Sequence, residues 1–454
     1  MTAAGTGTRR ILTGLGRLGA VLCALAAVLP APAAAVELVG FAALPADTFA
    51  AGPPSGGDSG DGTPISANGR TGPFGSQPVQ GMSAVQLATP RDGSFWLLTD
   101  NGYGSQSNSA DYHLRIYRVD PSLRGSESGD GSVAVLGFIE FADPDGHIPF
   151  AIVNGATAER VLTGADFDPE SFVFGANGDI WIGEEFGPFV LHFDPAGRLL
   201  RPPIATPDLD GAGGMSATAE VRAPQNPNLG GGASNLASSK GFEGMAWSPD
   251  RGVLYPMLEG TVDGDPSGSL RIYSFDVATA SFSGFVGFYA RDGHRIGDFT
   301  PVNDHEFLVI ERDNDQAASA DFKQIIRVDL DVQDVQGFVA KTPLVDLLDI
   351  ADPNDLDQDG STLFAFPFFT IESVYVLDAM TLFVANDNNY PFSVGRPPDI
   401  DDNEVILLGL DAPLPVVEAV PAFPWIARAL LAMGLVGVGS AALGRRLRAS
   451  PLRT

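Results

Sequence analysis

Cysteine is almost absent from this 454-residue chain, and its scarcity excludes several kinds of site. The one cysteine, Cys23, lies in an apolar run near the N-terminus. The rest of the chain therefore cannot form disulfides, thiolate zinc sites or iron–sulfur clusters, and it has no cysteine nucleophile. The five histidines include no His-x-x-x-His pair, and no Gly-x-Ser-x-Gly elbow of a serine hydrolase is found on a strand–turn–helix pattern.

Basic residues are also scarce, with 27 Lys plus Arg against 56 Asp plus Glu and a net charge of −29. Eight of the arginines lie in residues 1–35 and 421–454, which contain no acid, so residues 36–420 carry a net charge of −37. Such a body repels a phosphate backbone, which excludes nucleic acid as a partner. It favours divalent cations instead. Because 44% of the residues are hydrophobic and 29 are Phe, the charge does not predict disorder.

Residues 1–35 are typical of a secretion signal. Three arginines precede an apolar run at 18–29, and small residues at 33–35 provide a cleavage site. The alternative is a buried N-terminal helix. We expect export of the chain by the general or the twin-arginine route.

Residues 416–454 contain a second apolar segment, at 423–443, followed by a cluster of arginines. Its length can span a bilayer as a helix, and the cluster would remain on the cytoplasmic side. The tail resembles bacterial sorting tails of the PEP-CTERM type, although the Pro-Glu-Pro triplet is absent; the alternative is a permanent single-span anchor. Either way we expect the body, residues 36–415, to be exported to the cell envelope or beyond, with the membrane and the export and sorting machinery as partners.

Five similar units follow one another in the body, which has Gly-rich insertions near 52–78 and 206–238. Each unit has a short opening segment, an apolar strand that ends in acids, and a third strand. The opening segments begin near residues 81, 168, 241, 297 and 371. Four units have a candidate fourth strand, at 136–141, 199–204, 285–289 and 335–339, and residues 37–41 could complete the fifth.

This repeat predicts an all-β fold, a β-propeller of four-stranded blades that is closed by the N-terminal strand of the mature chain. Five blades are counted, and a sixth could lie in 141–165 or 340–370. The alternative is a β-sandwich, which would not explain why acids recur at matching places.

Acids recur at the opening segments and at the ends of the second strands, so superposed units would bring them to one face of the ring. Many carboxylates cannot ionise together in a dry site without counter-charge, and Ca²⁺ takes six to eight oxygen ligands. The alternative is solvated surface charge. The candidate metal ligands are Asp100, Glu170, Glu184, Glu185, Glu243, Glu259, Glu311, Asp313, Glu372 and Asp387.

A separate acidic segment, residues 355–360, matches the Asp-x-Asp-x-Asp-Gly start of an EF-hand loop. The twelfth position is Phe366 rather than Glu, so the EF-hand is incomplete. Asp355, Asp357 and Asp359 are candidate ligands of a calcium-stabilised loop, and a solvated acidic turn is the alternative.

Several motifs are shared with a known family. Residues 166–171 read Asp-Phe-Asp-Pro-Glu-Ser, residues 178–188 contain Trp-Ile-Gly-Glu-Glu-Phe-Gly-Pro, and residues 241–245, 311–313 and 386–390 add shorter motifs. Together they resemble the bacterial phytase-like family, described as having esterase-like activity. The resemblance covers about residues 80–410 and implies a propeller of the phytase kind, in which calcium ions at an acidic channel mouth hold phosphate.

Two functions of different classes are expected. The first is a Ca²⁺-dependent hydrolase of phosphate or other esters, with Glu185 or Glu243 as the general base. Asn101, Lys240, Arg312 and Asn388 are then candidates for binding a small phosphorylated or ester substrate. The second is a non-catalytic propeller, stabilised by calcium, that binds a surface polymer or a protein partner.

Overall fold

The computed structural model describes residues 36–88, 92–125, 128–210 and 214–416, without the side chains of 217 and 218. These residues form β-strands and loops, and their one helix is the short 3₁₀ segment Ala317–Ser319. No helical segment in the described ranges is long and apolar enough to cross a membrane. The all-β prediction is confirmed. The predicted signal and C-terminal tail lie outside the described residues.

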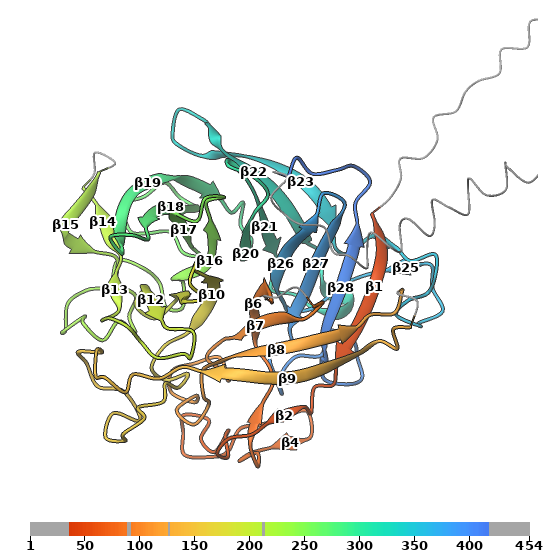
Figure 1. Ribbon diagram of the computed structural model, residues 1–454, viewed down its shortest axis with the longest axis horizontal. Helices are drawn as coiled ribbons and strands as arrows, with labels where there is room; N and C mark the ends of the chain where they lie inside the picture. Colours follow the sequence, from red (N-terminus) through yellow and green to blue (C-terminus); the bar gives the residue numbers. More distant parts are fainter. Residues whose placement is uncertain (1–35, 89–91, 126–127, 211–213, 417–454) are drawn as a thin grey trace, which may run out of the picture. The chain divides into compact units, whose positions relative to one another are not determined.

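Most strands belong to five antiparallel units in which neighbours in the chain are neighbours in the sheet (Figure 1). The first unit is β6 (Met82–Leu87), β7 (Phe95–Thr99), β8 (Arg115–Ser122) and β9 (Ser132–Glu140). The second is β10 (Pro169–Phe174), β11 (Ile180–Glu184), β12 (Phe189–Phe193) and β13 (Ile204–Ala205). The third is β16 (Phe242–Trp247), β17 (Val253–Leu258), β18 (Ser269–Asp276) and β19 (Ser281–Ala290). The fourth is β20 (Arg295–Pro301), β21 (Glu306–Arg312), β22 (Lys323–Gln333) and β23 (Val339–Asp346). The fifth is β26 (Thr370–Asp378), β27 (Thr381–Asp387), β28 (Asn403–Gly409) and β1 (Glu37–Leu44).

Short strand pairs lie outside these units. They are β2 (Phe49–Ala50) with β5 (Gln77–Pro78), β3 (Ser66–Ala67) with β4 (Arg70–Thr71), β14 (Pro207–Leu209) with β15 (Met215–Glu220), and β24 (Ile350–Ala351) with β25 (Leu363–Phe364).

The first strands of the five units contact one another in a cycle, in the order β6, β10, β16, β20, β26 and back to β6. The hydrophobic core has the same cyclic order. Each of five clusters of buried side chains combines residues of two successive units, and the cluster of the fifth and first units completes the circle. Because every sheet is covered on both faces by its neighbours, strands such as β11 and β12 are buried along their whole length. Sheets arranged radially in this way are typical of a propeller.

The N-terminal strand completes the fifth unit, as the repeat predicted. β1 pairs antiparallel with β28 from Glu37 to Leu44, with a shift in register between Leu38 and Gly40. Figure 1 shows β26, β27, β28 and β1 side by side. A single parallel bridge, Ala43 to Ser132, also joins β1 to β9 of the first unit. The strand that closes the ring is therefore more than 300 residues away in sequence from the other three strands of its unit, and it protects an edge that would otherwise be free.

Two predicted fourth strands are misplaced. Residues 335–337 lie in the turn before β23, which begins only at Val339; Gly337 has φ +87° and Val335 is fully exposed. In the second unit Leu199 forms an isolated bridge to Phe193, and the ladder is limited to Ile204–Ala205, because the prolines at 202 and 203 cannot donate to a ladder. Residues 141–165 form isolated bridges only, and 347–369 add only β24 and β25, so neither stretch forms a sixth four-stranded sheet.

Candidate functional site

The first strand of every unit has a bulge close to its start. The pairing with the second strand skips one residue in four units and two residues, Gly297 and Asp298, in the fourth. A bulge turns the skipped side chain away from the regular alternation and is common beside functional sites. We call these positions the bulge ring: Ser83, Glu170, Glu243, Asp298 and Glu372.

A second set of residues comes from the ends of the second strands. In four units, one residue there lies opposite the residue two positions before the bulge-ring residue, as Asp387 lies opposite Thr370 in the fifth unit. In the fourth unit the spacing is three positions. In three units the backbone N–H of this residue donates to the first strand, as Glu185 does to Asp168 O at 2.9 Å. We call these positions the end ring: Asp100, Glu185, Glu259, Arg312 and Asp387.

Eight of the ten ring residues, all except Ser83 and Asp298, line one cavity of about 230 Å³, to which all five units contribute. Its wall contains eight carboxylates and three cations. The carboxylates are those of Asp100, Asp168, Glu170, Glu185, Glu243, Glu259, Glu372 and Asp387, and the cations are Lys240, Arg295 and Arg312. The fourth unit supplies Arg312 to the end ring, where the other units supply an acid. In the bulge ring, neither Ser83 of the first unit nor Asp298 of the fourth lines the cavity.

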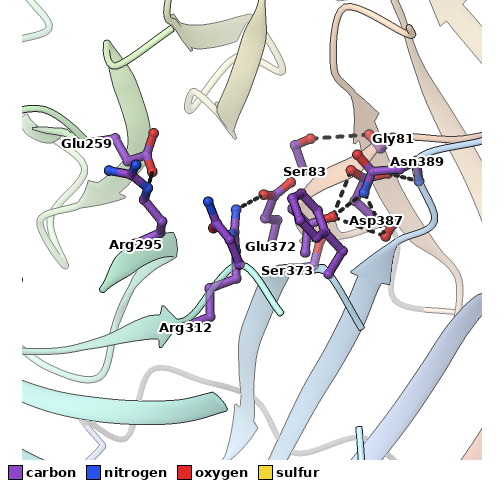
Figure 2. Close-up of polar contacts among 12 residues, drawn as sticks. Gly81, Ser83, Glu259, Arg295, Arg312, Glu372, Ser373, Asp387 and Asn389 are labelled. Atoms are coloured by element: carbon purple, nitrogen blue, oxygen red, sulfur yellow. Dashed lines mark hydrogen bonds and ion pairs between the residues drawn. The ribbon is translucent and has the colours of Figure 1, made fainter. Parts of the chain in front are cut away.

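The three cations lie against only two of the carboxylates. Arg312 Nη2 donates to Glu372 Oε1 at 2.6 Å, and Arg295 Nε lies 3.8 Å from Glu259 Oε1 (Figure 2). Lys240 Nζ also bonds to Glu259. Within the described residues, no lysine or arginine forms a salt bridge with the other six cavity carboxylates. The cavity therefore has an acidic part, whose carboxylates form no salt bridge with the described lysines and arginines, and a part where cations and acids are paired.

Burial and mutual repulsion raise the pKa values of several acids in this part. Burial raises the pKa of Glu170 well above its ordinary value, and the neighbouring Asp168 and Glu243 raise it further. Burial likewise raises the pKa of Glu243, with Glu259 and Glu372 adding to the effect. The pKa of Asp387 rises to about 7, mainly through burial and then through Glu372. Asp168 reaches a pKa of about 6 by burial, although hydrogen bonds from Asn101 oppose the shift.

Two groups of these acids have the geometry of a metal site. The ligand oxygens of Asp168, Glu170 and Glu185 lie within 4.8 Å of one another, and so do those of Glu185, Glu243 and Glu259. Glu185 belongs to both groups, and its Oε1 is buried without a hydrogen-bond partner among the described residues. The donor set is entirely carboxylate, which suits hard cations such as Ca²⁺ or Mg²⁺ rather than zinc or copper.

Glu184, a predicted ligand, points away from the cavity. Its two carboxylate oxygens accept hydrogen bonds from the backbone N–H groups of Phe186, Gly187 and Phe189 at 2.7–2.9 Å. Successive strand residues face opposite sides, so Glu184 supports the β11–β12 turn while Glu185 faces the cavity.

Glu311, Asp313 and Asn388 also lie outside the cavity. Glu311 accepts from Lys341 Nζ at 2.7 Å and from Tyr289, because it occupies the register of Glu184 rather than that of Glu185. Asp313 accepts backbone N–H bonds from 315, 321 and 322 and pairs with Lys323 at 2.8 Å. Asn388 donates to Asp401 O at 3.1 Å. The prediction that all ten acids converge is therefore wrong for Glu184, Glu311 and Asp313.

The other predicted substrate-binding residues do line the cavity. Asn101 donates from its backbone N and Nδ2 to the Asp168 carboxylate at 3.1 and 2.8 Å, so it holds an acid in place. Arg312 is buried, and its Nε has no hydrogen-bond partner in the described part of the chain. Asp355, Asp357 and Asp359 lie elsewhere, in the connection between β24 and β25.

Several cavity residues were not among the predicted site residues. Asp168 precedes its strand and lies within a quoted motif, so its spacing of two from Glu170 was an available signal. Asn389 likewise lies within a quoted motif, at 386–390, whereas Arg295 carries no such signal. Asp387 accepts from Asn389 N at 2.7 Å and from Thr370 Oγ1 at 3.0 Å (Figure 2), contacts that depend on the β26–β27 pairing.

Comparison with known proteins gives a family match across most of the body. Residues 77–390 match the model of the family described as "Phytase-like: Esterase-like activity of phytase", more than half of the chain. An "Uncharacterized secreted protein" of Arthroderma benhamiae is 29% identical over 123 residues, which are 25% of this chain and 22% of that protein. The chain thus aligns with about a fifth of the length of this curated relative.

Solved structures give weaker similarities. A luciferin-regenerating enzyme shares 12% identity at a TM-score of 0.32, over 75% of this chain and 78% of that one. The Dos1 propeller shares 10% identity at a TM-score of 0.30, over 76% and 72% of the two chains. Similarities this distant carry no information about activity.

Without divalent cations, we expect stability to fall as the pH rises from about 5 to 8. Asp168 and Asp387, with pKa values of about 6 and 7, keep protons in the folded state. The unfolded chain has already released them, since ordinary carboxyl pKa values are near 4. The folded state thus binds more protons in this window, and the free energy of unfolding falls as the pH passes 6 and 7.

Urea unfolding in chelator at several pH values measures this effect. Asp387→Asn should flatten the dependence near pH 7, whereas Asp304→Asn, which changes an exposed acid outside the cavity, should leave it unchanged. A wild-type midpoint that stays constant or rises between pH 5 and 8 would contradict the account.

Proposed function

Because this chain belongs to the phytase-like family, we propose that it is an exported, Ca²⁺-dependent hydrolase of phosphate or other esters. The observation that carries the proposal is the cavity of the two rings, where buried carboxylates that form no salt bridge with the described residues share one wall with arginine and lysine. We further propose that the five units are the five blades of a propeller, that residues 1–35 are removed on export, and that the C-terminal tail anchors or sorts the chain.

The residues that would hold calcium are Asp168, Glu170, Glu185, Glu243 and Glu259. They offer the two overlapping groups of oxygens described above, and Glu185 is common to both. Its unpartnered Oε1 supports this assignment, because a buried carboxylate oxygen without a donor is unfavourable until a cation reaches it. When bound, the ion would neutralise the oxygens of the ester and lower the pKa of an attacking water.

The protein groups themselves would position the substrate and move its proton. Arg312 and Lys240 lie on the cavity wall, and the free Nε of Arg312 is a donor available to an anionic oxygen. Glu243 and Glu185 are the candidates for the general base. Burial raises the pKa of both, and a base with a raised pKa accepts a proton more readily once it is ionised.

Changing Glu243 to Gln tests the metal-dependent reaction. The change keeps the shape and removes one charge, so we expect weaker Ca²⁺ binding and a fall of about 10²–10⁴-fold in hydrolysis. Calcium at a hundredfold excess over the dissociation constant should stabilise the wild type by about 2.7 kcal/mol, and the variant less. Titration calorimetry and assays with p-nitrophenyl phosphate and p-nitrophenyl acetate, with calcium and with chelator, provide the measurements.

Asp313→Asn is the matched control, since it removes an acid that the sequence also marks as a ligand but that lies outside the cavity. It should leave calcium binding and hydrolysis unchanged. If Glu243→Gln shifts stability by less than about 0.5 kcal/mol and leaves calcium binding as in the wild type, the acids are solvated charge.

Changing Arg295 to Gln tests whether the substrate is anionic. Arg295 lies on the cavity wall, its side chain is 34% exposed and it lies 3.8 Å from Glu259. The variant should raise KM several-fold for the phosphate ester and leave KM for the neutral acetate ester unchanged. Arg327→Gln is the control, because Arg327 is 38% exposed and lies 3.6 Å from Glu306 outside the cavity. Equal effects of Arg295→Gln on both esters would refute an anionic substrate.

The alternative is a non-catalytic propeller, stabilised by calcium, that binds a surface polymer or protein. It predicts calcium binding that depends on Glu243 together with no turnover of either ester. The same assays therefore distinguish the two functions.

A further inference from the structure

A second group of acids lies outside the central cavity, in the connection between β24 and β25. One carboxylate oxygen from each of Asp352, Asp355 and Asp357 lies within 4.8 Å of the others. Asp355 and Asp357 are half-buried, whereas Asp352 is 1% exposed. None of the three lines the central cavity.

Asp352 provides an independent sign of a ligand. Its Oδ2 accepts a hydrogen bond from Leu356 N at 2.6 Å. Its Oδ1 is buried and has no hydrogen-bond partner among the described residues. A buried carboxylate oxygen without a donor is costly unless a cation neutralises it. Neighbouring oxygens of Asp355 and Asp357 would be further ligands of that cation.

The connection also touches the strand that closes the ring. Ala351 N donates to Val36 O at 2.9 Å, and β24 pairs in parallel with β1 at Glu37. Arg124, which follows β8 of the first unit, donates from Nε to Leu356 O at 2.5 Å.

The same arginine is bound to the closing strand through its backbone. Arg124 N donates to Phe41 O at 2.9 Å, and Phe41 N donates to Arg124 O at 3.1 Å. The acidic connection, the closing strand and the first unit are therefore joined through one residue.

We propose that Asp352, Asp355 and Asp357 bind a calcium ion that fastens β1 to the ring. The ligands are hard oxygens on a short connection, the kind of flexible oxygen site that suits Ca²⁺ better than the rigid octahedral geometry of Mg²⁺. Asp352 takes the place that the sequence motif gives to Asp359, whose Oδ1 instead accepts from Ser361 N at 2.7 Å. The ion orders the connection, and the connection holds β1 through Ala351 and Arg124.

Hydrogen exchange on the full-length protein, with calcium and with chelator, tests this site by a local readout. At free calcium a hundred times the dissociation constant, amides of residues 350–362 and of β1 should exchange up to about 100-fold more slowly, because opening must first release the ion. Asp352→Asn should abolish that protection, since Asn keeps an acceptor for Leu356 N but removes the charge.

Three further variants make the test decisive. Asp355→Asn should also abolish the protection, and it is compatible with the positive φ of +52° at this position, so it serves if Asp352→Asn does not fold. Two controls should keep the calcium-dependent protection. Asp349→Asn changes an exposed acid outside the group, and Glu185→Gln alters the central cavity. A wild type without calcium-dependent protection at 350–362, or an Asp352→Asn protein protected like the wild type, would overturn the proposal.

Discussion

Repulsion among buried carboxylates is the constraint on which this structure depends. Eight of them line one cavity with three cations, and burial together with mutual repulsion raises the pKa of Glu170 and Glu243. A ring of sheets that share their cores pairwise is rigid enough to hold these groups together. Folding thus creates a place where either protons or cations must be bound, and a divalent cation satisfies several oxygens at once.

The bulges explain how a repetitive sheet produces this place. In a regular strand, successive side chains point alternately to the two faces of the sheet. The skipped pairing at Glu170, Glu243 and Glu372 breaks this alternation, and all three residues line the cavity. The fourth unit departs from the pattern, since its wider bulge directs Asp298 to the backbone N–H groups of Phe299 and Val374 at 2.7 and 2.8 Å. Arg312 then supplies a positive charge to the wall. Together with Lys240, which precedes the third unit, the fourth unit gives the cavity its uneven distribution of charge.

The sequence allowed the all-β class, the five-fold repeat and the closing strand to be predicted, because apolar strands ending in acids recur and 37–41 stands alone. The sequence could not show that Glu185 and Asp387 line the cavity while Glu184 and Glu311 lie outside it. A shift of one residue in pairing register reverses the face of a strand, and the register depends on contacts with distant residues. The contact of Asn101 with Asp168 illustrates the same limit, because the two residues lie 67 positions apart in the chain. Asp352 was missed in the acidic connection, since only the fold reveals its burial.

The central claim is that the cavity acids bind a cation rather than remain as protonated groups. The most direct test is a crystal structure of the protein grown with Ca²⁺, with anomalous scattering measured to locate the ion. The account predicts an anomalous peak in the cavity, about 2.3–2.6 Å from carboxylate oxygens that include Glu185 Oε1. A cavity that contains only water, with its carboxylates in hydrogen-bonded pairs, would contradict it.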